Sequence, residues 1–151
     1  AAYWAHCGDS RLYLVRGGGI YQMTTDDSAV AALVSQGLLT REEARTHAER
    51  NVILRALGTH PEVQVTVWDQ PLPVRVDDVF LLCSDGLTDL VEDHELMAAT
   101  AAQTLAEACD ALVALARSRG GFDNITVAVL RAAAAQEDRP APVTRELRMP
   151  G

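Results

Sequence analysis

The stretch Val79-Phe80-Leu81-Leu82-Cys83-Ser84-Asp85-Gly86 joins a continuous apolar run to an acidic turn. Five consecutive apolar residues bounded by turn-forming residues predict a short strand that is buried on both faces of a sheet. The run stops at Ser84, so the carboxylate of Asp85 is expected just beyond the C-terminal end of the strand. The stretch therefore predicts both a central strand and a candidate site at its end.

Two further aspartates lie at the edges of apolar runs. Asp9 stands between the runs at 3–7 and 12–15, and Asp123 comes just before the strand-like run at 125–130. Neighbouring strands in a sheet are about 5 Å apart, so antiparallel pairing of these runs would bring the acids to one rim. Carboxylates held in glycine-rich turns suit a hard divalent cation. The sequence therefore predicts a metal site.

Each acidic motif is also compatible with an ordinary turn. Asp85 before Gly86 is a common turn dipeptide, because both residue types tolerate positive φ. The segment at 8–10 fits a hairpin turn, and Asp123 with Asn124 fits a loop after a helix end. The occurrence of all three favours a shared site, because no local structure requires an acid at each edge.

Three strings, in this order, resemble the later motifs of the metal-dependent PPM-type (type 2C) serine/threonine protein phosphatases, and they are most similar to the bacterial members. They are AHCGDSRLY (5–13), LLCSDGLTD (81–89) and GFDNITV (121–127). Between them, residues 37–44 and 50–58 resemble the flap segment of the bacterial type. The resemblance extends in family order over nearly all of the chain before residue 131.

The resemblance implies an α+β fold, namely the family's four-layer α-β-β-α sandwich of antiparallel sheets. Residues 1–131 would form the C-terminal portion of a phosphatase catalytic domain, with the flap at about 29–58. The family's N-terminal portion carries a phosphate-binding arginine and an Asp-Gly motif whose aspartate bridges two metals, and this portion is expected upstream of Ala1. Residues 132–151 are rich in alanine, charge and proline without apolar periodicity, which predicts a disordered tail.

The implied reaction is the hydrolysis of phosphoserine and phosphothreonine in proteins by a metal-activated water, with two or three Mn²⁺ or Mg²⁺ ions per complete site. By position, Asp85 and Asp123 match the ligands of the second catalytic metal. Asp9 matches the acid that, with the equivalent of Asp85, holds a third metal in bacterial members. The supporting positions around these ligands are Ser84, Gly86 and Asn124. No protein nucleophile is expected, and the substrate-binding residues stay unassigned.

Three functional hypotheses remain open. The first is an active phosphatase whose N-terminal part lies upstream; this chain alone would then be inactive, because the bridging carboxylate is absent. The second is a non-catalytic module, derived from the phosphatase fold, that binds a partner or a metal. The third is an aspartyl-phosphate enzyme with Asp85 as nucleophile, and it ranks last because position 87 is leucine where that class normally has a second acid.

Composition limits the partners. The formal net charge of −8 argues against nucleic acid or an anionic membrane as a partner, and no apolar run approaches the roughly 20 residues of a membrane helix. Cys7, Cys83 and Cys109 are expected to be reduced, which favours the cytoplasm. The expected partners are phosphorylated proteins, substrates of a bacterial serine/threonine kinase. Unpaired strand edges around 79–83 also predict self-association or binding of a complementing N-terminal segment.

Local patterns place the remaining elements. Further strands are expected to end at Cys7 and to span 12–16, 20–24 and 63–67. Helices are expected at 29–36 with Asp26 or Asp27 as cap, after Thr40, from His94 with Asp93 as cap, and after Thr104. Two of these starts carry a capping box, in which Thr40 faces Glu43 and Thr104 faces Glu107.

Overall fold

A computed structural model describes residues 1–59, 61–102 and 104–134. These residues form two antiparallel sheets, a four-stranded one in the order β3-β2-β5-β6 and a two-stranded one of β1 and β4. The strands are β1 (Ala2–His6), β2 (Arg11–Arg16), β3 (Gly19–Gln22), β4 (Thr66–Leu72), β5 (Val79–Cys83) and β6 (Val127–Arg131). The helices are α1 (Ala29–Ser35), α2 (Arg41–Thr46), α3 (Asp85–Thr88), α4 (Asp93–Ala99) and α5 (Leu105–Ser118).

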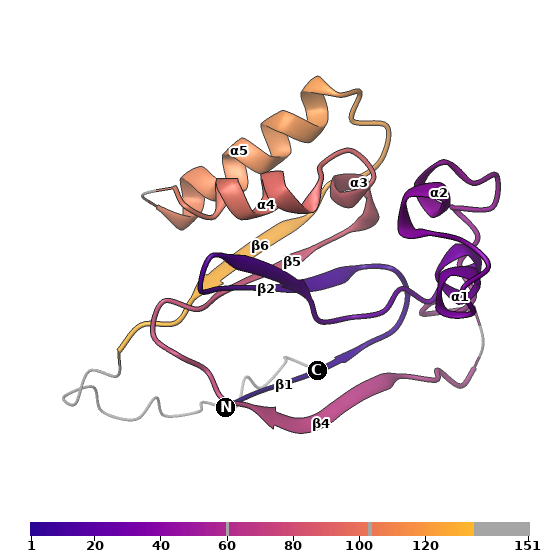
Figure 1. The fold of residues 1–151 in the computed structure, drawn as a ribbon, viewed down its shortest axis with the longest axis horizontal. Coiled ribbons are helices and arrows are strands. Elements are labelled where there is room, and N and C mark those ends of the chain that lie inside the picture. The colour runs from indigo at the N-terminus through magenta and orange to yellow at the C-terminus, as the bar shows by residue number, and fades with distance from the viewer. Residues whose placement is uncertain (60, 103, 135–151) are drawn as a thin grey trace, which may run out of the picture.

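The elements stack in layers. Helices α4 and α5 cover one face of the four-stranded sheet, and the β1-β4 sheet lies on its other side (Figure 1). Helices α1 and α2 lie beside the sheets, at the end where α3 follows β5 (Figure 1). The predicted α+β sandwich of antiparallel sheets is confirmed. In the part of the chain described, one outer helical layer is present, formed by α4 and α5.

The hydrophobic core lies between the four-stranded sheet and the helices that cover it. Tyr13 and Leu81 from the sheet and Leu112 from α5 are each fully buried in one cluster. In β5, burial alternates: Val79, Leu81 and Cys83 are buried, whereas Leu82 is 42% exposed. The prediction that this strand is buried on both faces is therefore wrong, because the second sheet has only two strands in the described residues and leaves Leu82 open.

Strand β4 is displaced from its predicted position. It begins at Thr66 and runs through Pro71, whereas the valine-rich segment at 63–67 was expected to be the strand. A proline fits inside β4 because, among the described residues, this strand is an edge paired with β1 and its register shifts between Trp68 and Leu72, the segment that contains Pro71. The third strand also ends earlier than expected, at Gln22, and the last begins later, at Val127.

The helix starts follow local capping rules with two corrections. Both predicted capping boxes, Thr40 with Glu43 and Thr104 with Glu107, are confirmed. The cap of α1 is Ser28, whose Oγ accepts a hydrogen bond from the Ala31 N–H at 3.3 Å. Neither acid proposed for this cap fills it, because both carboxylates bind arginines. The second correction is a shift of one residue in α4, which begins at Asp93 with Glu92 as its cap and Glu95 completing the box.

The predicted flap at 29–58 contains α1 and α2. Its two ends meet in a β-bridge between Ser28 and Ile53, and the Ala29 N–H donates to the Val52 carbonyl at 2.9 Å. The predicted tail begins with residues 132–134, which follow β6 without forming a helix or strand. The rest of the tail, 135–151, lies outside the described residues, so the proposed domain boundaries stay a prediction. None of the described helices is long and apolar enough to cross a bilayer.

Candidate metal centre

Strand register brings the three acidic turns to one end of the four-stranded sheet. Cys83 at the end of β5 pairs with Arg11 at the start of β2 and with Val127 at the start of β6. Asp9 precedes β2 by two residues, Asp85 follows β5 by two, and Asp123 lies in the turn before β6. Because the pairings are antiparallel, all three lie past the same end of the sheet.

Ser84 connects the turn of Asp85 to the turn of Asp123. Its N–H donates to the Thr126 carbonyl at 3.1 Å, its hydroxyl donates to the Asn124 carbonyl at 3.0 Å, and the Thr126 N–H donates back to the hydroxyl at 3.0 Å. These bonds replace regular strand pairing at 124–126, which is why β6 begins later than its apolar pattern predicts. Asn124 contacts Asp123 through its backbone N–H, which donates to Oδ1 at 2.6 Å.

Gly86 allows the two turns to approach closely. A Cβ at this position would lie 2.4 Å from the Asn124 carbonyl oxygen and 3.4 Å from Cβ of Asp123. Any larger residue would have to push the backbone of the neighbouring turn away. The Gly86 N–H also donates to Oδ1 of Asp85 at 2.8 Å and so sets the orientation of that carboxylate.

Asp9 lies in an environment that disfavours its negative charge. Partial burial raises the pKa of the Asp9 carboxyl, and the nearby carboxylate of Asp85 raises it further. Two like charges near each other at the end of a sheet are stabilised by a bound cation. Asp123, by contrast, is exposed.

The donor set fits a hard cation chemically but is incomplete. All three acids offer oxygen, the donor that Mg²⁺ and Mn²⁺ prefer. Among the residues that the structure describes, however, no three histidine, cysteine, aspartate or glutamate side chains are grouped closely enough to hold an ion by themselves. The sheet end therefore presents part of a ligand set.

The residues that hold the Asp9 turn were not predicted from the sequence. Asp26 and Asp27 were considered only as helix caps, yet the first pairs with Arg11 and the second with Arg55. The signal available was the acidic doublet itself, which lies directly after a strand and before a helix. The arginine partners could not be inferred, because they are 15 and 28 residues away in the chain.

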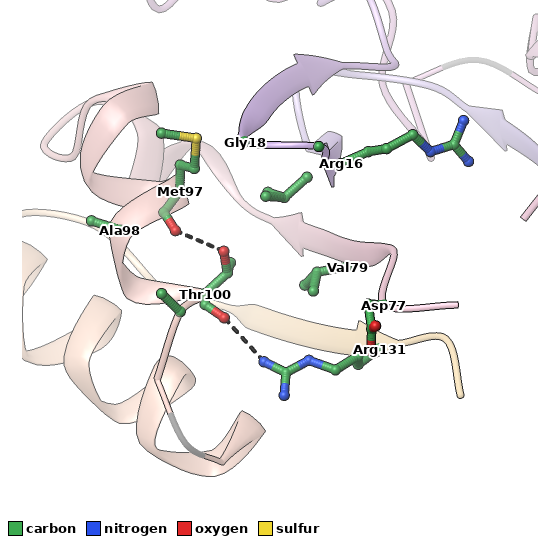
Figure 2. Close-up of a pocket in the computed structure, with 11 residues that line it drawn as sticks. Arg16, Gly18, Asp77, Val79, Met97, Ala98, Thr100 and Arg131 are labelled. Atoms are coloured by element: carbon green, nitrogen blue, oxygen red, sulfur yellow. Dashed lines mark hydrogen bonds between the residues drawn. The ribbon is translucent and has the colours of Figure 1, made fainter. Parts of the chain in front are cut away.

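Two surface pockets lie at different distances from the acidic turns. One, of about 550 Å³, is at the opposite end of the four-stranded sheet; Val79 and Met97 line it, and Arg131 donates to the Thr100 carbonyl at 3.1 Å across it (Figure 2). None of the three aspartates lines this pocket. The other, of about 420 Å³, is lined by Cys7 and Arg55 among others and so adjoins the Asp9 turn.

The fold and the acidic sheet end together define a layered α+β protein with donor chemistry for divalent cations, and comparison with known proteins identifies the family. No family model matches the chain. The serine/threonine protein phosphatase PstP of Mycobacterium tuberculosis is 45% identical over 124 residues, which cover 82% of this chain and 24% of that protein. The serine/threonine phosphatase stp of Listeria monocytogenes is 38% identical over 138 residues, covering 91% of this chain and 54% of the relative.

Solved structures agree with the sequence comparison. The crystal structure of M. tuberculosis PstP/Ppp superposes with a TM-score of 0.77 at 41% identity, covering 87% of this chain and 55% of that one. A PstP catalytic domain in complex with two manganese ions superposes with a TM-score of 0.73 at 40% identity, covering 87% and 54%. The chain belongs to the PPM-type family of serine/threonine protein phosphatases, as the resemblance of its motifs indicated. It spans about a quarter of the M. tuberculosis protein and about half of the Listeria protein.

Proposed function

We propose that this chain contributes metal-binding carboxylates to a metal-dependent serine/threonine protein phosphatase. The observation that carries the proposal is the strand register, which brings Asp9, Asp85 and Asp123 past one end of the same sheet. These acids lie in the motifs that the chain shares with the family. The relative with bound manganese supports Mn²⁺ as the ion, and Mg²⁺ fits the same oxygen donors.

Within this proposal the acids have unequal tasks. Asp85 and Asp123, whose turns meet at Gly86, would bind one catalytic cation, and Asp9 with Asp85 would bind a further cation. Bound ions of this kind supply a water of lowered pKa and neutralise the charge of the phosphoryl oxygens. The chain's own contribution is to hold the carboxylates in place through Ser84. No side chain of the chain is assigned as a nucleophile.

The proposed substrates are proteins phosphorylated on serine or threonine by a bacterial kinase. The names of the relatives, which are serine/threonine phosphatases, support this class of substrate. The proposed compartment is the cytoplasm, because Cys7, Cys83 and Cys109 are all free thiols.

A second candidate function is a non-catalytic module that binds cations weakly. It is favoured by one observation, namely that the described residues hold only part of a ligand set. Both candidate functions place the cation at the same site, and only the phosphatase would hydrolyse a phosphorylated substrate.

Release of inorganic phosphate from a phosphothreonine peptide with Mn²⁺ present distinguishes them. It should be measured for the gene product that contains this chain and for the 151-residue chain alone. We expect turnover from the gene product and a loss of at least about 100-fold in Asp85→Asn, because a ligand to the reacting ion is removed. Asp110→Asn, an exposed acid on α5, serves as the control and should leave turnover unchanged. If Asp85→Asn retains full activity, the assignment is wrong; Mn²⁺ binding without turnover in the gene product supports the second candidate.

A further inference from the structure

We propose that Asp27, neutralised by Arg55, is a positioning residue that fixes the turn carrying Asp9 for cation binding. The inference rests on the proposed function, since it concerns how a proposed metal ligand is held. Neither residue belongs to the three acidic motifs. Asp27 is identified by its contacts with Gly8, directly before Asp9, and Arg55 by its ion pair with Asp27.

Asp27 binds both backbone polar groups of Gly8. The Gly8 N–H donates to Oδ2 of Asp27 at 3.0 Å, and the Asp27 N–H donates to the Gly8 carbonyl at 2.9 Å. Gly8 has a φ of 101°, a conformation that non-glycine residues rarely adopt. Asp27 is only 7% exposed, so water offers little replacement for these bonds. The backbone next to Asp9 is therefore held by one buried residue, whose carboxylate accepts from the Gly8 N–H and whose backbone N–H donates to the Gly8 carbonyl.

Arg55 keeps the Asp27 carboxylate in place. Its Nη2 donates to Oδ1 of Asp27 and, at 3.1 Å, to the Thr66 hydroxyl at the start of β4. The Leu54 N–H donates to the Asp27 carbonyl at 2.7 Å, which fixes the backbone of Arg55 nearby. A buried carboxylate is costly unless it is paired, and Arg55 provides the pairing from a segment far along the chain.

The other side of the turn is held by the neighbouring acid. Arg11, two residues after Asp9, donates from Nε to Oδ1 of Asp26 at 2.9 Å and from Nη2 to Oδ2 at 2.5 Å. Asp9 thus lies between two anchored residues, Gly8 and Arg11, whose partners are adjacent in sequence. This arrangement restricts where the Asp9 carboxylate can be. Groups that orient a metal ligand in this way typically change metal affinity by about 10-fold to 100-fold.

The opposite end of the sheet offers a matched control. Asp78 is 2% exposed and accepts hydrogen bonds from Nε of Arg16 at 2.7 Å and from Nη2 at 2.6 Å. It also accepts from the Arg75 N–H at 2.6 Å, as Asp27 does from Gly8. Removing Asp78 therefore removes an arginine pair that is buried somewhat more deeply than Arg55–Asp27, together with a backbone contact. It does so far from the acidic turns, so it reports the effect of lost stability alone.

The experiment compares Asp27→Ala, Arg55→Met, Arg55→Lys and Asp78→Ala in the gene product that contains this chain. Mn²⁺ affinity is measured by electron paramagnetic resonance of the free ion, and thermal unfolding is followed in parallel. We expect Asp27→Ala and Arg55→Met to weaken Mn²⁺ binding by about 10-fold, and Arg55→Lys to retain most of it. Asp78→Ala should lower the melting temperature at least as much as Asp27→Ala does, while its Mn²⁺ affinity changes by less than about twofold.

The outcomes separate this inference from the function on which it rests. Unchanged Mn²⁺ affinity in Asp27→Ala, or equal losses in Asp27→Ala and Asp78→Ala, would overturn the positioning role. Amide hydrogen exchange provides a second readout that needs no metal: exchange at Gly8 and Asp9 should accelerate in Asp27→Ala and not in Asp78→Ala. Unchanged exchange at both amides would also overturn it. If the unaltered gene product binds no Mn²⁺, the proposed function fails, while accelerated exchange would still support the positioning of Asp9.

Discussion

At the scale of single residues, a glycine and a serine determine how closely two of the acids approach. Gly86 removes the atom that would collide with the Asn124 carbonyl, and the Ser84 hydroxyl both donates to and accepts from the turn beyond. The positions of Asp85 and Asp123 are thus fixed by neighbouring residues, Gly86 and Ser84, that carry no charge. The meeting of the three acids at one sheet end was predictable because each lies at the edge of an apolar run, whereas the close approach that Gly86 permits depends on contacts across 38 residues of sequence.

Replacement of Gly86 by alanine tests this close approach. We expect Gly86→Ala to lower the free energy of unfolding by roughly 1–3 kcal/mol, because the new methyl group would lie 2.4 Å from a backbone oxygen. It should also weaken Mn²⁺ binding, since the Asp123 turn must move. Denaturant unfolding and Mn²⁺ titration provide the two measurements.

Gly37→Ala is the control for this prediction. Gly37 has a φ of 72° and nothing within 4 Å of a built Cβ, so alanine there strains the backbone without a collision. It should destabilise the chain and leave Mn²⁺ affinity unchanged. Equal Mn²⁺ affinity in Gly86→Ala and the unaltered chain would show that the turns need not be so close.

At the scale of elements, the two faces of the four-stranded sheet differ. One face packs against α5, where Leu112 is fully buried, whereas the other carries Leu82 and Leu130, which are 42% and 53% exposed. Helix starts were predictable to within about a residue, because a capping box is a local interaction. The limits of β4 were not predictable from the sequence. The valines at 63–67 have a high propensity for strands, but pairing with β1 determines which residues form β4.

Leucine truncations on the two faces should have unequal costs. Leu112→Ala should destabilise the chain by about 2–5 kcal/mol, because it leaves a cavity between α5 and the sheet. Leu130→Ala removes the same atoms from an exposed site on β6 and should cost less than about 1 kcal/mol. Denaturant unfolding measures both. Similar costs for the two variants would contradict the one-sided core.

The ion pair between Glu95 of α4 and Arg119, directly after α5, predicts that the stability of the chain depends on pH. Arg119, at the end of α5, together with the Glu92 N–H lowers the pKa of Glu95 to about 2. Because the folded pKa lies below the unfolded one, the stabilisation is complete above about pH 4.5 and is lost as the pH falls toward 2. Glu95→Gln should therefore lower the melting temperature at pH 6 and have a smaller effect at pH 3. An equal effect at both pH values would exclude a contribution from the charge.

At the scale of the whole molecule, β4 is exposed on both of its faces in the described residues. Val67 and Trp68, which point to opposite faces of the strand, are 62% and 47% exposed, although Trp68 stacks on Trp4 with ring centroids 5.1 Å apart. The general architecture was predictable from the motifs. The extent of burial was not predictable, because it depends on how many strands of the two sheets face one another.

This open apolar surface predicts self-association of the 151-residue chain. The expected unpaired edges around 79–83 are not found, because β5 pairs with β2 on one side and β6 on the other; it is exposed apolar faces that contact with other chains would cover. Sedimentation velocity at increasing concentration should show a mass above that of the monomer. A concentration-independent monomer that melts in one sharp cooperative transition would contradict this expectation.

The central claim is that three separate turns share one cation-binding end of the sheet, and paramagnetic broadening by Mn²⁺ tests it most directly. On titration of the ¹⁵N-labelled chain, amide signals of the turns at 8–10, 84–86 and 123–124 should broaden first and together. Asp85→Asn should abolish this joint broadening, while Asp110→Asn should preserve it. Broadening that starts elsewhere on this acidic chain, or that never reaches one of the three turns, would contradict a shared cation-binding end.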